Sequence, residues 1–160
     1  MEWLFPWFLF AHILGAIIAF GPSFSFPILG AMGGAEPQHA NFATRISEAL
    51  TSRRVLPIGI TLPITGLAII GVRQINPFDR PWWWLALAIV LYIAVYSYGF
   101  FVQSRNVRRV IEITSSPPPP GASGPPPELM ALVRRIQLGG IGMGILLVSI
   151  VFLMVVKPQI

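Results

Sequence analysis

The chain has no cysteine among its 160 residues, and this absence excludes several kinds of site at once. Disulfide bonds, iron–sulfur clusters and thiolate metal sites all need cysteine sulfur, so this chain can form none of them by itself. Charged residues are scarce as well, at 11% of the chain, whereas apolar residues make up 54%. Together with a mean hydropathy of +0.72, this composition is typical of an integral membrane protein.

Four apolar segments are long enough to cross a bilayer. A hydrocarbon core about 30 Å thick needs about 20 apolar residues in a helix. The segments lie at residues 3–32, 55–72, 82–102 and 136–156. They fill more than half of the chain and leave no room for a separate soluble domain. We therefore predict a single all-α membrane domain over residues 1–160, a transmembrane four-helix bundle.

Prolines predict a break in the first segment, and the connections between segments have features of their own. Prolines at 22 and 27 predict a kink or break near residues 21–27. Residues 41–54 place apolar side chains at helical spacing, which predicts a short amphipathic helix along the cytoplasmic interface. Residues 114–127 contain seven prolines with serine, glycine and alanine, and we expect them to form an extended or disordered cytoplasmic tether.

The distribution of charge predicts how the chain sits. A net charge of +5 would suggest nucleic acid in a soluble protein, but here the basic residues flank membrane segments, where they set topology and meet anionic lipid. Nucleic-acid binding is not expected. Loops one and three hold eight arginines: Arg45, Arg53, Arg54, Arg105, Arg108, Arg109, Arg134 and Arg135. The other side holds only Arg73, Arg80 and Lys157, so we predict that both termini lie outside the cytoplasm.

Tryptophans support this orientation. Trp3 and Trp7 open the first segment, and Trp82, Trp83 and Trp84 open the third, both at the predicted outer interface. Indole rings favour the headgroup level, so we expect an aromatic belt there. The first segment has no basic residue before it and is too long for a signal peptide, so it is expected to remain in the protein.

His12 is the single histidine within the four segments. Counting residues inward from the outer interface puts His12, Thr65, Tyr92 and Ser149 at similar depth, one on each helix. An imidazole N–H turned to lipid would be left unsatisfied, so we expect His12 to face inward and to hydrogen-bond to Tyr92, Thr65 or a trapped water. His39 lies in a polar loop and is expected to be solvated.

Different functions of this histidine remain open. His12 could be an axial ligand of haem b, with Thr65 and Tyr92 beside it and with Ala11, Gly15 and Ala19 leaving room for a porphyrin face. A second axial ligand would then have to come from another copy or a partner. Alternatively, His12 is a core histidine that fixes helix register, or a contact for a proton or quinone. No catalytic residue and no other metal site is predicted, because the segments hold no Asp, Glu, Lys or Arg and the chain has no nucleophile–base pair.

Small residues recur at helix-packing spacing. Gly15 and Ala19 follow Ala11 at every fourth position, and Gly140 and Gly144 form a G-x-x-x-G pair in the last segment. Such stripes let helices approach closely. We therefore predict contact with a membrane-protein partner or a second copy through these helices, in addition to the lipid bilayer.

Two stretches carry a family resemblance: residues 10–16 (FAHILGA), and residues 62–67 (LPITGL) after the basic pair Arg53 and Arg54. They resemble the opening of an uncharacterised family of small bacterial four-span proteins, known only as predicted integral membrane proteins. More distantly they are similar to copper-resistance D-type proteins and to haem-binding protoporphyrinogen oxidase. The resemblance implies a multi-pass protein of the bacterial cytoplasmic (inner) membrane. The oxidase comparison alone would make His12 a haem ligand.

Two functions follow from these observations. The first is a non-enzymatic integral membrane protein, an accessory or structural subunit of a larger membrane complex. The alternative is a haem b membrane protein in redox or tetrapyrrole chemistry that uses His12.

Overall fold

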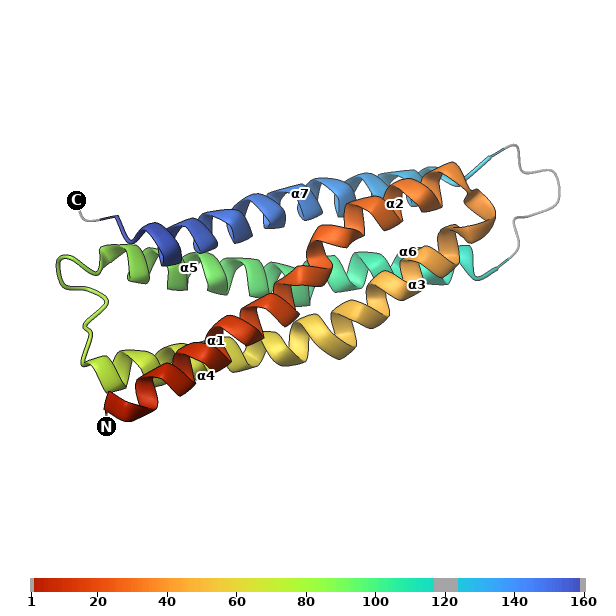
Figure 1. Ribbon diagram of the computed structural model, residues 1–160. Helices are drawn as coiled ribbons and strands as arrows, with labels where there is room; N and C mark the ends of the chain where they lie inside the picture. The colour runs from red at the N-terminus through yellow and green to blue at the C-terminus, as the bar shows by residue number, and fades with distance from the viewer. Residues whose placement is uncertain (1, 117–123, 159–160) are drawn as a thin grey trace.

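The computed structural model describes residues 2–116 and 124–158, and every regular element in them is helical. The first stretch contains η1 (Glu2–Leu4), α1 (Phe5–Phe20), η2 (Gly21–Ser25) and α2 (Phe26–Ala35). The second contains η3 (Pro37–His39), α3 (Ala40–Leu50), η4 (Thr51–Val55) and α4 (Leu56–Arg73). The third contains α5 (Trp83–Tyr98), η5 (Gly99–Gln103) and α6 (Ser104–Thr114), and α7 (Pro127–Val156) is the fourth. The predicted all-α four-helix bundle is confirmed (Figure 1).

These elements form four rods, each long and apolar enough to cross a membrane: Glu2–Ala35, Pro37–Arg73, Trp83–Thr114 and Pro127–Val156. The rods contain 30–37 residues, which corresponds to about 45–55 Å at 1.5 Å per residue. A hydrocarbon core is only about 30 Å thick. Each rod is therefore long enough to extend beyond the core, and the sequence shows where. The additional residues of the last three rods, relative to the predicted spans, lie at the arginine-rich end.

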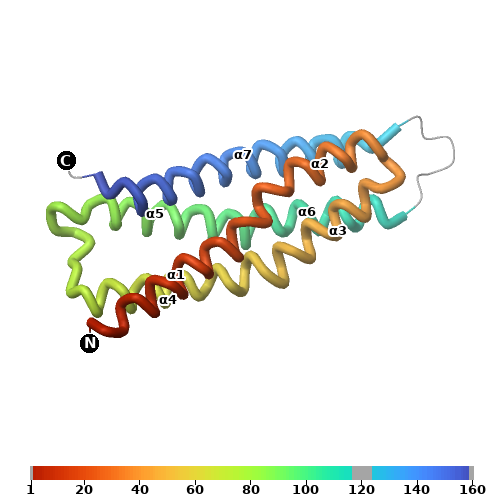
Figure 2. The backbone as a smooth tube through the Cα atoms, in the orientation of Figure 1, coloured from red at the N-terminus to blue at the C-terminus, as the bar shows by residue number. Residues whose placement is uncertain are grey.

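The first rod changes partner along its length. α1 packs on α4, whereas α2 lies toward α7 and packs on α3, so the rod runs diagonally across the bundle (Figures 1 and 2). The change occurs at η2, which contains Pro22 and is followed by Pro27. A proline removes one helical hydrogen bond and its ring displaces the preceding turn. The predicted break near residues 21–27 is confirmed.

The predicted amphipathic helix also forms, as α3. It runs into α4 through η4, so the two belong to one continuous rod, and it packs between α2 and α6. The helix therefore packs on helices of the same chain and does not lie flat along the interface as predicted, and Phe42 of its apolar side stays exposed. Both termini and the α4–α5 connection lie at the opposite end of the bundle (Figure 1). The Pro-rich stretch at residues 114–127 falls in part on residues 117–123, which lie outside the described residues.

The buried core is small and has two parts. One contains Trp84, Leu85, Ala88 and Leu153, and the other contains Val95, Leu147 and Ile150. Most other large apolar side chains on the rods are exposed, as expected of helices whose solvent is lipid.

One prediction about the tryptophans is wrong. Trp3 and Trp7 are exposed, as an interfacial belt requires, but Trp84 is only 4% exposed and belongs to the core. The beginning of α5 packs against α7 and the end of α4, and this contact covers the third tryptophan of the triplet. Trp82 lies against Trp84, with ring centroids 5.8 Å apart.

Candidate functional site

His12 on α1 is hydrogen-bonded to Thr65 on α4, with 2.9 Å between His12 Nδ1 and Thr65 Oγ1. The imidazole is half-buried and faces a neighbouring helix, as the sequence predicted. Thr65 Oγ1 also lies 2.9 Å from the carbonyl of Thr61 and 3.1 Å from that of Leu62. The histidine is thus attached to the C-terminal half of α4 through a threonine.

The protons of this pair can be counted. A threonine hydroxyl has one proton to donate and two lone pairs to accept with. If His12 Nδ1–H donates to Thr65 Oγ1, the hydroxyl proton is free to donate to a carbonyl of its own helix. This arrangement satisfies both polar groups without water, which matters because neither would find a partner among acyl chains.

Small residues bring α1 and α4 together around the pair. Gly15 and Ala19 are buried. A Cβ on Gly15 would lie 3.2 Å from Leu62, and a Cβ on Gly66 would lie 3.4 Å from the His12 ring. The close approach predicted for the Gly15–Ala19 stripe is therefore made within the chain. Because both residues are buried, neither is available to another protein, and Leu62 of α4 fills the space beside Gly15.

Tyr92 on α5 does not contact His12. Its hydroxyl donates to the carbonyl oxygen of Gly59 on α4, at 2.6 Å. The reason lies four residues further along α4, where Pro63 stands inside the helix. In an α-helix the N–H of residue 63 would donate to the carbonyl of residue 59, but proline has no N–H. Tyr92 supplies the missing donor from a neighbouring helix.

Tyr96 repeats the contact one turn along α5. Its hydroxyl donates to the carbonyl of Leu56 at 3.0 Å, and its ring stacks on that of Tyr92 with centroids 5.9 Å apart. A Cβ on Gly59 would come within 2.9 Å of the Tyr96 ring, so glycine is the residue that lets both tyrosines reach the α4 backbone. The two rings thereby connect the α1–α4 pair to the α5–α7 pair.

The predicted polar layer is therefore split into separate contacts. His12 and Thr65 form one, and Tyr92 contacts α4 six residues away from Thr65, about 9 Å along the helix. Ser149 donates to the carbonyl of Ile145 on its own helix, at 2.9 Å. The sequence located the polar groups, but depth alone does not show toward which neighbour a side chain points.

A further polar contact lies near the arginine-rich end. Gln103, the last residue of η5, donates through Nε2 to the carbonyl of Ile136 on α7 at 2.9 Å. Its Oε1 is buried and has no partner among the described residues. Gly139 lies opposite, and a Cβ there would overlap the Tyr98 hydroxyl and come within 2.9 Å of Gln103 Oε1. This is the tightest glycine contact between described helices.

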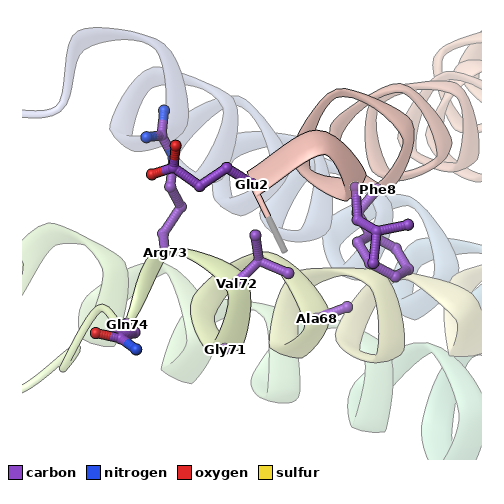
Figure 3. A pocket seen from close by; sticks show the side chains of 8 residues that line it. Glu2, Phe8, Ala68, Gly71, Val72, Arg73 and Gln74 are labelled. Carbon is purple, nitrogen blue, oxygen red and sulfur yellow. The ribbon is translucent and has the colours of Figure 1, made fainter.

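The opposite end carries an open groove of about 720 Å³ between the N-terminal turn and the end of α4 (Figure 3). The Arg73 guanidinium lies 4.0 Å above the ring of Phe5 and borders this groove. The polar lining consists of Glu2, Arg73 and Gln74, and the remainder is apolar. Because the groove is open to solvent, it provides no water-free site for chemistry.

Among the residues that the structure describes, no three histidine, cysteine or carboxylate side chains gather to hold a metal ion. The haem site predicted at His12, Thr65 and Tyr92 stays a prediction. Thr65 would orient the imidazole through Nδ1 and leave ligation to Nε2. The fit is otherwise poor, because α4 packs on the imidazole and Tyr92 is committed to Gly59.

Sequence reasoning missed Gly59, Gln103 and Gly139. A signal for the first was present, since a proline at position 63 of a helix frees the carbonyl of residue 59. Nothing in the sequence pointed to Gly139, because its partners depend on how α5 and α7 are aligned.

No curated protein and no solved structure matches this chain. The distant resemblance to copper-resistance D-type and haem-binding proteins therefore stays a prediction. A family model described as "Predicted integral membrane protein (DUF2269)" matches residues 7–158. This match spans all four apolar rods, the His12–Thr65 contact and both tyrosine contacts. The chain therefore belongs to the DUF2269 family of predicted integral membrane proteins.

Proposed function

We propose that this protein is a non-enzymatic membrane subunit that binds the transmembrane helix of a partner protein through α7. The observation that supports this is the environment of Gly140 and Gly144. A Cβ on either would meet no other atom of the described chain within 4 Å, so this G-x-x-x-G pair is not used internally. Large apolar side chains flank it, among them Ile141 and Ile145 at 61% and 62% exposure.

The polar groups that contact α4 agree with a structural role. His12, Thr65, Tyr92 and Tyr96 all make hydrogen bonds between helices of the same chain. Each contact joins α4 to a neighbouring helix and fixes its rotation. A rigid bundle of this kind would present α7 in one orientation, which a helix-packing surface requires.

The test compares leucine variants of the glycines on α7. Gly140→Leu/Gly144→Leu should abolish co-purification of the partner from mildly solubilised membranes. Gly142→Leu is the matched control, since Gly142 also faces open space but lies outside the four-residue spacing. Equal retention of the partner by both variants would refute the proposal. A cysteine at Ile145 that crosslinks to its own copy would identify the partner as a second copy, because the natural chain has no cysteine.

For the membrane, we propose the bacterial cytoplasmic membrane with both termini outside the cytoplasm. The support is that eight of the eleven basic residues lie on the side opposite the termini, and only Arg73, Arg80 and Lys157 lie on the same side as the termini. Fusions of alkaline phosphatase and of green fluorescent protein to the C-terminus test this orientation. Active phosphatase and a dark fluorescent fusion are expected, and the reverse would overturn it.

Haem b binding at His12 is the alternative function. The Thr65 hydrogen bond favours it, because a fixed imidazole is typical of axial ligands. The space around His12 favours the structural role, since α4 occupies the side where Gly15 and Gly66 lie. An absorption spectrum of the purified protein decides between them. A Soret band that disappears in His12→Ala would establish haem binding, and a spectrum without one at full protein concentration would exclude it.

A further inference from the structure

Contacts between the rods place five arginines in one zone of the bundle, at the end opposite the termini. Gln103 on η5 contacts Ile136 on α7, so Arg105 lies level with Arg134 and Arg135. On the other side, Arg108 pairs with Glu48 at 3.4 Å and Tyr96 bonds to Leu56. Arg53 and Arg54 lie between these two contacts. We call Arg53, Arg54, Arg105, Arg134 and Arg135 the arginine belt.

Two local features build this belt. η4 and η5 are both π-helical. Arg53 and Arg54 lie in the last turn of η4, and Arg105 follows η5 by two residues. A π-helical turn inserts one residue and so rotates the side chains that follow it. All five belt arginines are exposed. By these contacts Arg105, Arg134 and Arg135 share one level within about one helical turn, about 5 Å, and Arg53 and Arg54 lie on the membrane side of that level, within about two turns.

No acidic side chain among the described residues neutralises the belt. At this end Glu36 lies 3.7 Å from His39, and Glu48 pairs with Arg108. The remaining two carboxylates both pair with Arg109, Glu112 at 3.1 Å and Glu128 at 3.0 Å. The other two acidic residues of the chain, Glu2 and Asp79, belong to the end that holds the termini. The belt therefore carries five positive charges that need anions from outside the chain.

The belt coincides with the edge of the apolar band. On the membrane side of Arg105 stand Phe100, Phe101 and Val102, with exposures of 50%, 56% and 41%. On α7 the apolar run begins at residue 136, directly after the belt, and its 21 residues to 156 span about 31 Å. This length equals the hydrocarbon thickness of a bilayer. Beyond the belt, α3 and α6 continue with amphipathic sequences.

We propose that the arginine belt binds the phosphate groups of anionic phospholipids in the leaflet at that end of the bundle. Guanidinium groups bind phosphate through paired N–H donors, and the adjoining phenylalanines would contact the acyl chains of the same lipids. A headgroup is favoured over a soluble anion because the belt lies beside exposed apolar side chains and extends across three rods. The site is independent of α7 packing and of any haem.

Native mass spectrometry of the detergent-purified full chain tests this proposal. The probes are dioleoyl phosphatidylglycerol and dioleoyl phosphatidylcholine, which share acyl chains and differ in headgroup charge. Phosphatidylglycerol should bind more tightly. Arg134→Gln/Arg135→Gln should weaken it about 25-fold, at about fivefold for each arginine, whereas Arg134→Lys/Arg135→Lys should retain most of the binding. Arg73→Gln/Arg80→Gln, at the other end, is the matched control and should bind as the unaltered chain does.

Several results would overturn the proposal. These are equal binding of the two lipids, unchanged phosphatidylglycerol binding by the glutamine variant, and full competition by millimolar inorganic phosphate, which would indicate a soluble anion as the ligand. A second test uses the unaltered protein and therefore does not depend on whether a variant folds. Raising the salt from about 0.05 M to about 0.5 M should release phosphatidylglycerol, because partly solvated charges are screened at that ionic strength. Binding that is insensitive to salt would contradict the belt.

Discussion

Replacing Tyr92 by phenylalanine removes one hydroxyl and leaves the aromatic ring, its stacking on Tyr96 and the helix around it unchanged. The hydroxyl donates to the Gly59 carbonyl at 2.6 Å, and Pro63 deprives that carbonyl of its helical donor. A buried acceptor left without a partner costs about 1–3 kcal/mol. Hydrogen bonds between membrane helices average about 0.6 kcal/mol and reach about 1.7. We therefore expect Tyr92→Phe to lower the free energy of unfolding by about 1–2 kcal/mol.

A second substitution isolates the cause. Pro63→Ala restores an N–H at position 63, which can donate to Gly59 within the helix. In that background Tyr92→Phe should cost less than about 0.5 kcal/mol, so the two substitutions should couple by about 1 kcal/mol. Tyr96→Phe is the matched control. Its acceptor, Leu56, retains the N–H of Ile60 four residues on, so the loss should be smaller.

The assay is reversible unfolding of the detergent-solubilised protein in sodium dodecyl sulfate, followed by tryptophan fluorescence. Trp84 lies in the core beside α7 and should report the transition. An equal cost of Tyr92→Phe with Pro63 and with Ala at that position would refute the reasoning. So would a loss from Tyr96→Phe as large as that from Tyr92→Phe, because the missing proline N–H would then explain nothing.

Three further predictions concern helix contacts. Gly139→Ala should lower the melting temperature by several degrees, because the added Cβ would overlap the Tyr98 hydroxyl. Gly140 faces open space, so Gly140→Ala should leave the melting temperature unchanged. Thr65→Val and His12→Ala should each lower the free energy of unfolding by about 1 kcal/mol. The double variant should lose little more than either single variant, because both substitutions remove the same hydrogen bond. Additive losses in the dodecyl sulfate assay would contradict this. Arg109→Gln should leave the melting temperature nearly unchanged, because its two ion pairs are exposed to solvent. A clear drop of the melting temperature in low salt would mean that the α6–α7 connection depends on these ion pairs.

The sequence predicted those features that depend on one residue or on one segment. Length and hydropathy predicted the four rods, and Pro22 and Pro27 predicted the break in the first. His12 was expected to face inward and to hydrogen-bond to Tyr92, Thr65 or a trapped water, because lipid cannot satisfy its ring N–H, and the structure places it 2.9 Å from Thr65.

Features that depend on the alignment of two helices were not predicted. Tyr92 was expected near His12 because both lie at similar depth, but depth does not fix rotation, and its hydroxyl reaches Gly59 instead. Trp84 was expected at the interface because tryptophan favours headgroups, but packing of α5 against α7 covers it. Gly15 was expected to contact a membrane-protein partner or a second copy, but it packs against Leu62 of α4 in the same chain.

The position of the membrane relative to the rods can be measured directly, because the natural chain has no cysteine and single cysteines can be introduced one at a time. We predict that cysteines along residues 136–156 of α7 resist a water-soluble maleimide in intact membranes. Cysteines at Met130 and Val133, beyond the arginine belt, should react from the side opposite the termini. Protection that extends through residues 127–135, or reactivity in the middle of the 136–156 stretch, would contradict the account that the bilayer ends at the belt.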